Sequence, residues 1–554
     1  MTEPSPDAPA AASGLRSSSA TPARPPNGSA PVADGTLVSS INPFLPASEY
    51  VPDGEPRVFG DRVYVYGSHD LAEAAPVMCS GDYVCYSAPL SDLSKWRYEG
   101  VIYRRDQDPF ARAATTGGGM LGMLKSHLFA PDVVEVDGKY YLYYGIGASR
   151  SGIAVAVADS PIGPFGYVVR YPDSAKPDGW RDGKDGLDDG DMAFKGGQAA
   201  ISRRGIRFKE YPYDPAVMLH DGRLFLYFGL LNCYVVELDL RDMRTVVKNA
   251  AGGYATEIFR AKPGQLIRSK LFGRRKDAHF VNGPSIREVD GRFVLSYYAT
   301  GDGGFNGLYY AVADKPEGPF VPKGPLVSLG NVRLRGQTAA TDHVGNIHGG
   351  MFHVDEQWYQ IYHRPTKAGR AACAVPLART ADGEFEHAEH TSMGFSTKPL
   401  DAFHRWPAYM ACHLTDRKGA SGKNAPVIVQ RDYDNPEGVL PVVTSLRAGS
   451  VVGYKYLDFG TDPASAVQVS IQIKPTVRGR VDVVLDDPRS AQPIATIEID
   501  GPVGGWDAYS APMPEVSGVH AVYLIAGPEA KELGDLDSPR HVRRQDSLEG
   551  SVSW

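Results

Sequence analysis

Cysteine is scarce in this sequence, with five in 554 residues. The five are odd in number, scattered and not at the spacing of zinc ligands: Cys79, Cys85, Cys233, Cys373 and Cys412. This scarcity argues against a disulfide framework and favours buried or half-buried free thiols in a reducing compartment. One alternative stays open, because Cys79 and Cys85 would flank a hairpin and pair if oxidised.

Long apolar runs are missing as well. No stretch has the roughly 18 apolar residues that a membrane span needs. The first residues show no basic segment followed by an apolar one, which is the pattern of a signal peptide. We therefore expect no membrane partner and a cytoplasmic location.

Positive charge is not in excess either, since 58 Lys and Arg stand against 65 Asp and Glu, for a net charge of -7. No basic stripe with interleaved aromatic residues occurs, so the sequence argues against a nucleic-acid partner. A neutral substrate such as an oligosaccharide or polysaccharide fits this charge better. Nothing in the sequence indicates an oligomeric state.

The sequence also lacks sustained runs of Ala, Leu, Glu and Lys at helical spacing, while it has 61 Gly, 43 Pro and 30 Tyr. This composition predicts an all-β fold rich in turns. A chain of 554 residues is too long for one hydrophobic core. We expect a large domain and at least one smaller one.

One segment forms the unit around which the rest is organised. In PDGEPRVFGDRVYVYGSHD, residues 52–70, β-branched and aromatic residues flank a turn at Gly60-Asp61, which predicts a β-hairpin. The pattern recurs four times, and the five turns lie roughly 65 to 85 residues apart, at Asp61, Asp137, Asp221, Asp290 and Asp355. Five such hairpins predict a five-bladed β-propeller.

The repeat also predicts where chemistry occurs. Equivalent positions of the blades of a propeller lie at the same depth near its axis, so five residues just before the hairpin turns should meet there: Asp53, Asp132, Asp214, Asn282 and His348. Carboxylates held that close must differ in pKa to coexist, which is what a proton-transfer enzyme needs. The alternative for Asp53 and Asp214 is that they are plain turn residues.

Composition divides the chain into five parts. We expect a disordered tail over residues 1–40, a propeller over 41–400, a linker over 401–425, a β-sandwich of jelly-roll type over 426–533 and a charged tail over 534–554. A long polar loop, residues 173–207, is either a wall of the binding site or merely mobile. Large aromatic residues that close the outer strands are expected to be core plugs: Trp96, Phe165 and Phe320.

Residues 41–400 resemble glycoside hydrolase family 43, the five-bladed-propeller arabinofuranosidases, xylosidases and arabinanases. The likeness rests on separate motifs in all five blades: GEPRVFGD after Asp53, Ala130-Pro131-Asp132, Asp214-Pro215, FVNGPSIR at 280–287, and Asn346 to Gly349 with Tyr362 to Pro365. Phe129 stands where the family has Trp. The strands after residue 449 are similar to the family 6 carbohydrate-binding sandwich, although a stabilising cap on the propeller is the preferred interpretation.

The resemblance implies a role for each motif residue. Asp53 would be the general base, Asp214 would tune and orient the acid, and His348 would lie beside an axial calcium ion, usually through water. An ordinary axial histidine is an equal alternative for His348. Contacts with the sugar are implied for Asp132, Phe129, Phe280, His348 and Arg364, with Asp132 mainly a structural hydrogen-bond acceptor.

The fourth-blade motif departs from the family, in which a Glu at the position of Asn282 is the general acid. An amide cannot release a proton at working pH, so Asn282 is either a degenerated acid or an adapted substrate contact. Carboxyls near it in sequence are Asp277, Glu288 and Asp302.

Two functions remain after this departure. The first is an inverting glycosidase of the α-L-arabinofuranosidase or β-xylosidase type, in which Asp53 activates a water in a gap of about 6.5–9.5 Å between the two carboxyls. The alternative is a propeller that binds glycans without hydrolysing them.

Overall fold

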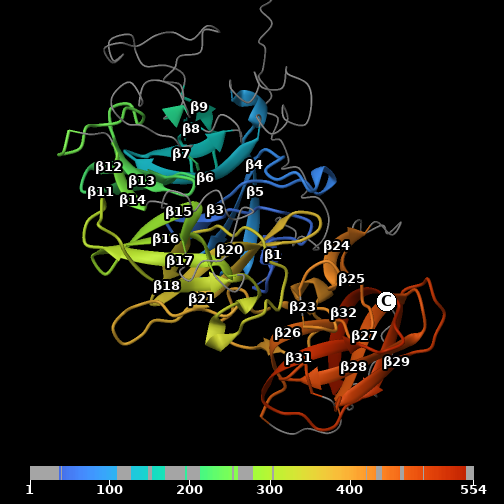
Figure 1. Ribbon diagram of the computed structural model, residues 1–554. Helices are drawn as coiled ribbons and strands as arrows, with labels where there is room; N and C mark the ends of the chain where they lie inside the picture. Colours follow the sequence, from blue (N-terminus) through green and yellow to red (C-terminus); the bar gives the residue numbers. More distant parts are fainter. Residues whose placement is uncertain are drawn as a thin grey trace, which may run out of the picture.

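Seven β-sheets make up the part of the chain that the computed structural model describes (Figure 1). The described residues are 36–38, 40–108, 127–146, 152–168, 194–195, 213–252, 255–259, 279–301, 305–419, 421–431, 440–461, 467–490 and 492–543. Five sheets lie in the first part of the chain and two in the C-terminal part, as expected of an all-β protein.

The first sheet has strand order β1-β5-β4-β3-β2. Its strands are β1 (Thr36–Val38), β2 (Glu55–Phe59), β3 (Arg62–Tyr66), β4 (Tyr83–Pro89) and β5 (Lys95–Tyr103). The second sheet contains β6 (Leu128–Val136), β7 (Lys139–Ile146), β8 (Gly152–Ala158), β9 (Gly166–Tyr167) and β10 (Phe194–Lys195).

The next three sheets are meanders of neighbouring strands. The third contains β11 (Ala216–His220), β12 (Arg223–Phe228), β13 (Cys233–Leu238) and β14 (Thr256–Phe259). The fourth contains β15 (His279–Val289), β16 (Arg292–Gly301), β17 (Phe305–Ala313) and β18 (Val321–Ser328). The fifth contains β19 (Met351–Val354), β20 (Gln357–Pro365) and β21 (Arg370–Leu377).

The first hairpin strand of each of these five sheets faces the axis of a closed ring. Each of these strands contacts the next one: β2 contacts β6, β6 contacts β11, β11 contacts β15, β15 contacts β19, and β19 contacts β2. Beside the last contact, Gly54 and Gly349 form a parallel bridge that closes the ring. In Figure 1 the colours accordingly pass around the wheel from blue through green to yellow. The predicted five-bladed propeller is confirmed.

The hairpin turns explain why the repeat carries aspartate. Asp137, Asp221, Asp290 and Asp355 have φ angles of 51°, 47°, 52° and 49°, in the left-handed region that short polar side chains tolerate. The aromatic plugs are buried as predicted: Trp96 is 0 %, Phe165 1 % and Phe320 8 % exposed. The five cysteines are all buried and free.

The last two sheets pack face to face as the predicted sandwich. One contains β22 (Leu400–Asp401), β23 (His413–Thr415), β26 (Val451–Asp458), β28 (Gly479–Leu485), β29 (Ala495–Ile499) and β31 (Val519–Ala526). The other contains β24 (Val427–Arg431), β25 (Leu440–Thr444), β27 (Val467–Pro475), β30 (Asp507–Pro512) and β32 (Gly534–Arg543).

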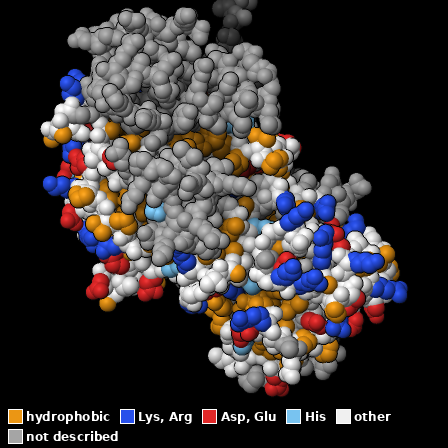
Figure 2. Space-filling model, in the orientation of Figure 1, with side chains coloured by type: hydrophobic (Ala, Val, Ile, Leu, Met, Phe, Trp, Pro, Cys, Tyr) orange, Lys and Arg blue, Asp and Glu red, His pale blue; other side chains and the backbone are white. Residues whose placement is uncertain are grey.

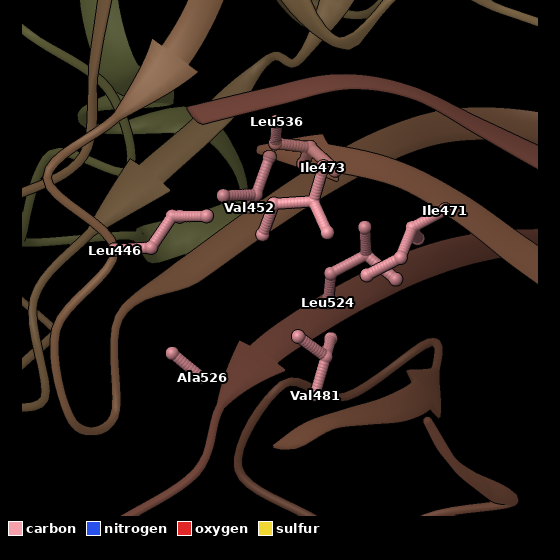
Figure 3. Close-up of a pocket in the computed structure, with 8 residues that line it drawn as sticks. All are labelled: Leu446, Val452, Ile471, Ile473, Val481, Leu524, Ala526 and Leu536. Carbon is pink, nitrogen blue, oxygen red and sulfur yellow. The ribbon is translucent and has the colours of Figure 1, made fainter. Parts of the chain in front are cut away.

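A small cavity lies between these two sheets. Figure 3 shows that side chains from both sheets point into it, and they are all aliphatic: Leu446, Val452, Ile471, Ile473, Val481, Leu524, Ala526 and Leu536. A sugar needs hydrogen-bond partners as well as apolar contact, so this cavity is part of the core and not a sugar site.

Three expected boundaries differ in the structure. Strand β1 lies within the expected tail 1–40 and pairs with β5. Strand β22 begins at the last residue of the expected propeller and enters the expected linker 401–425, β23 lies within that linker, and both strands pair with β26. Strand β32 lies within the expected tail 534–554, yet it pairs with β27 along its length. The charged residues of this segment led to the prediction of a tail, but a strand needs apolar residues on only one of its faces. Leu536, at 2 % exposure, lies on the buried face of β32.

Helices among the described residues are short 3₁₀ turns: η1 (Ala72–Ala74), η2 (Arg105–Gln107), η5 (Leu329–Asn331), η6 (Leu334–Gly336) and η7 (Ala408–Met410). Within that part of the chain, no helix has the length and apolar character to cross a membrane.

Lys and Arg side chains gather on the face of the sandwich turned to the viewer in Figure 2. Several cations of the sandwich have acidic partners, such as Arg431 with Asp535 at 3.5 Å and Arg405 with Asp537 at 2.8 Å. This pairing reduces the net positive charge of the surface.

Candidate active site

Asp53 and Asp214 come together near the axis. Asp53 immediately precedes the first-blade hairpin and Asp214 the third-blade hairpin, and they are 5 % and 4 % exposed. Their φ angles are 60° and 48°. The guanidinium of Arg370 lowers the pKa of both aspartates, and the charge of Asp53 raises the pKa of Asp214. The closed ring of five blades thus brings together two acids that are far apart in the sequence.

Asp53 is surrounded by groups that keep it ionised. Nη1 of Arg370 donates to both of its carboxylate oxygens at 3.0 Å, and the Ser68 hydroxyl donates at 2.6 Å. Burial by itself would raise the pKa of Asp53, but Arg370, the nearby imidazoles and Ser68 lower it to about 2. The carboxylate can therefore accept a proton over the whole physiological range of pH.

Asp214 has the opposite environment. Burial raises the pKa of its carboxyl well above the usual value, and the negative charge of Asp53 raises it further. The guanidinium of Arg370 and a hydrogen bond from the backbone N–H of Gly283 only partly oppose this. The pKa values of Asp53 and Asp214 are thus shifted in opposite directions, the division of roles that acid–base chemistry requires.

Asn282 lies beside these acids on β15. The register of β15 against β16 shifts on both sides of Asn282, which pairs with Tyr298, so the residue sits in an irregular, bulged stretch. Its side chain is half-buried and makes no hydrogen bond with the described part of the chain. The next residue, Gly283, has φ +63° and lies so close to the His348 ring that a Cβ there would approach it to 2.7 Å.

Two histidines of the fifth blade complete the cluster. His363 accepts a hydrogen bond from the backbone N–H of Asp53 at 3.0 Å, and burial lowers its pKa to about 3. Burial also lowers the pKa of His348, whose Nδ1 lies 3.8 Å from Asp53 Oδ1 and is buried without a hydrogen-bond partner. Both rings are therefore neutral near pH 7.

Two ion pairs fill the axis next to this cluster. Arg57 of the first blade donates through Nε to Asp132 at 2.7 Å, and Asp132 accepts from the backbone N–H of Val217 in the third blade at 2.7 Å. Arg287 of the fourth blade donates to Glu55 at 2.6 Å and to the Met351 carbonyl of the fifth at 2.7 Å. These two pairs, which we name the axial ion pairs, link all five blades.

The axial ion pairs bear on the expected calcium ion. Calcium takes about six to eight oxygen ligands, whereas the carboxylates of Asp132, Glu55 and Asp53 are each engaged by a guanidinium. The described residues contain no group of three or more His, Cys, Asp or Glu side chains placed to hold a metal ion. They do not fit a directly coordinated calcium ion, and an ion held by His348 through water stays a prediction.

The other expected sugar contacts lie in different places. Asp132 is fully buried with both oxygens in hydrogen bonds, as expected of a structural acceptor. The Phe129 ring lies 5.6 Å from that of Tyr213, next to Asp214, and Phe280 packs in the core between the third and fourth blades. Arg364 is not brought to the cluster.

Arg364 instead joins the propeller to the sandwich. Its guanidinium pairs with Asp342 at 3.1 Å and donates to the backbone carbonyls of Tyr409 and Ala411. It is 2 % exposed, so none of it remains for a substrate.

The candidates for a replacement acid do not enter the described cluster. Glu288 is exposed and pairs with His220 at 3.2 Å, near the outer end of its hairpin. Asp277, Asp302 and the loop 173–207, except for β10 (Phe194–Lys195), lie outside the described residues.

Sequence reasoning missed the residue that organises the cluster, Arg370. It bonds Asp53 and also Asp70, to which Nε and Nη2 donate at 2.8 and 2.9 Å. The one available signal was a charged residue that opens the otherwise apolar strand β21. Ser68 and Asp70 lie outside the repeated positions and gave no signal of their own, whereas His363 lies in the fifth-blade motif Tyr362 to Pro365 but received no role.

A scan against protein-family models finds no match. The chain is 31 % identical over 517 residues to a protein of Thermoclostridium stercorarium described as xylosidase/arabinosidase, covering 87 % of this chain and 95 % of that one. It is 24 % identical over 498 residues to the arabinoxylan arabinofuranohydrolase of Paenibacillus polymyxa, covering 81 % and 65 %. A solved family 43 arabinoxylan arabinofuranohydrolase of Bacillus subtilis in complex with cellotetraose aligns with a TM-score of 0.44 at 21 % identity, covering 92 % and 98 %.

Proposed function

We propose a function for this chain, which belongs to glycoside hydrolase family 43 and is a glycosidase of the arabinofuranosidase/xylosidase type. It cleaves terminal arabinofuranosyl or xylosyl residues from plant-type oligosaccharides, with inversion at the anomeric carbon. The observation that carries the proposal is Asp53, an ionised carboxylate near the axis of the propeller. It takes a proton from water as that water attacks the anomeric carbon. Because Asn282 cannot donate a proton, the leaving group needs a proton from elsewhere.

A substrate panel with one matched pair of variants tests this proposal. Aryl α-L-arabinofuranosides and β-D-xylosides should be hydrolysed, aryl galactosides much less, and NMR should show the inverted anomer as the first product. Asp53→Asn should lose about 10²- to 10⁴-fold in kcat/KM. Asp61→Asn makes the same change at the exposed turn of the same hairpin and should retain full activity.

Other outcomes would sink the proposal. A first product with the substrate's own anomeric configuration would contradict inversion. Glycan binding with no hydrolysis of any aryl glycoside would favour a propeller that binds and does not cleave.

We propose further that the sandwich stabilises the propeller rather than binding sugar. Gln430 of β24 donates to the hydroxyl of Tyr50 at 2.9 Å, and Tyr50 lies against Gly369, next to Arg370. The sandwich thereby supports the segment that carries the guanidinium of the cluster. Calorimetric titration of the Asp53→Asn protein with xylo-oligosaccharides should give one site per chain, and a second site would contradict this role.

A further inference from the structure

The described cluster contains three carboxyls, and two of them pair with the same guanidinium. Asp53 and Asp70 share the guanidinium of Arg370, which contacts Asp53 at 3.0 Å and Asp70 at 2.8 Å. Asp70 also accepts a hydrogen bond from the backbone N–H of Cys79 at 2.7 Å. Asp53 is therefore not suited to release a proton to a leaving group, and both oxygens of Asp70 are occupied by Arg370 and the Cys79 N–H.

Asp214 differs from both. Within the described part of the chain no Lys, Arg or His lies within ion-pair distance of its carboxyl. It accepts a hydrogen bond from the backbone N–H of Gly283, the residue directly after Asn282. Its carboxyl therefore lies beside the position from which the family's general acid acts, in the same cluster as the base.

We propose that Asp214 is the general acid of this enzyme and delivers the proton to the glycosidic oxygen. The inference rests on the proposed function and changes the role implied for Asp214 from orienting an acid to being one. Burial and the charge of Asp53 keep the proton on it before the reaction, as a general acid requires.

The proton balance closes without another reactant. Water adds its oxygen to the anomeric carbon and passes a proton to Asp53, while the bond to the glycosidic oxygen breaks and that oxygen takes the proton of Asp214. After the products leave, Asp53 releases a proton to water and Asp214 takes one up. The net reaction is the addition of one water across the glycosidic bond.

The groups that face Asp214 set the pH range of this step. Those in the described chain are Asp53 and Arg370, together with the phenol of Tyr213, whose pKa burial raises well above its usual value. Tyr213 stays neutral, and the charges of Asp53 and Arg370 are constant above pH 4. A basic limb in the pH profile of kcat/KM should therefore belong to Asp214.

The test compares two leaving groups in Asp214→Asn. A 2,4-dinitrophenyl glycoside needs no acid, whereas a xylo-oligosaccharide or a methyl glycoside does. We expect kcat/KM to fall about 10²- to 10⁴-fold on the unactivated substrates and less than about ten-fold on the activated one, with loss of the basic limb. Asp221→Asn, the same change at the exposed turn of the same blade, should alter neither.

A second variant separates chemistry from folding. Asn282→Glu added to Asp214→Asn places a carboxyl at the neighbouring position, and recovery of more than about ten-fold on unactivated substrates would support a lost proton donor.

Equal losses on both kinds of substrate would overturn the assignment of Asp214, as would no loss on either. So would a wild-type enzyme that cleaves activated glycosides alone. The first two results leave the proposed function standing. A wild type that cleaves activated glycosides alone, or neither kind, would contradict that function as well.

Discussion

Arg370→Gln removes the guanidinium that pairs with both Asp53 and Asp70 and keeps a polar side chain in its place. In the native protein the pKa of Asp53 is about 2 against an ordinary 3.8, which corresponds to about 2 kcal/mol of folding free energy. Because the folded-state pKa is the lower one, this stabilisation is present above about pH 4 and is lost as the pH falls through 2. The variant loses it at all pH values.

Two measurements follow from the same loss. Breaking a buried ion pair costs about 3–5 kcal/mol, so urea denaturation at pH 7 should show a free energy of unfolding lower by that amount. Without the arginine, the pKa of Asp53 should rise by about 1 to 3 pH units, and the acid limb of kcat/KM on an activated aryl glycoside should move up with it.

The matched control is Arg379→Gln. Arg379 is a partly exposed arginine that follows β21 in the same blade and pairs with Asp290, which is itself exposed. Its replacement should cost less than about 1 kcal/mol and leave the acid limb in place. If Arg370→Gln also cost less than about 1 kcal/mol and did not move the acid limb, ion pairing would not be what keeps Asp53 ionised.

Three further predictions concern the axis and the sandwich. Treatment with EDTA should change kcat/KM by less than about two-fold, since Arg57 and Arg287 supply the axial positive charge, and recovery of more than about ten-fold on adding calcium would contradict this. Arg364→Met should lower the free energy of unfolding by about 3–5 kcal/mol, because Asp342 stays buried and loses its guanidinium partner. Arg335→Met, at an exposed arginine that pairs with Glu389, should cost less than about 1 kcal/mol, and equal costs would contradict the role of Arg364 as a buried ion-pair partner. Deleting residues 534–554 removes β32 and should abolish cooperative unfolding of the sandwich, whereas deleting 544–554 should preserve cooperative unfolding. If the sandwich still unfolded cooperatively without β32, the pairing of β32 with β27 would be dispensable.

The residues that the sequence located correctly are those of the repeat. Alternating strands around an aspartate turn predicted the hairpins, and the fivefold recurrence predicted that Asp53 and Asp214 meet near the axis. Asp132 came from the same pattern, but its partner Arg57 did not, because an arginine on a strand looks like a solvated residue until a second blade faces it.

Arg364 shows the limit of motif reasoning in this chain. It follows His363 directly in a motif of the fifth blade, yet only His363 meets Asp53, while Arg364 bonds the backbone near the sandwich. Successive residues of a strand point to opposite faces, and nothing in the sequence states which face meets the axis.

The sequence by itself determined the five-bladed propeller. Strand pairing and turn formation within each hairpin depend on a few neighbouring residues, and the number of hairpin repeats determines the number of blades. Only the tertiary structure decided which charges meet, because Asp53, Arg370 and Asp70 are paired across about three hundred residues by the closure of the ring. The opposite pKa shifts of Asp53 and Asp214 are likewise a tertiary property, since burial and the neighbouring charges, not residue type, determine which of two aspartates has the higher pKa.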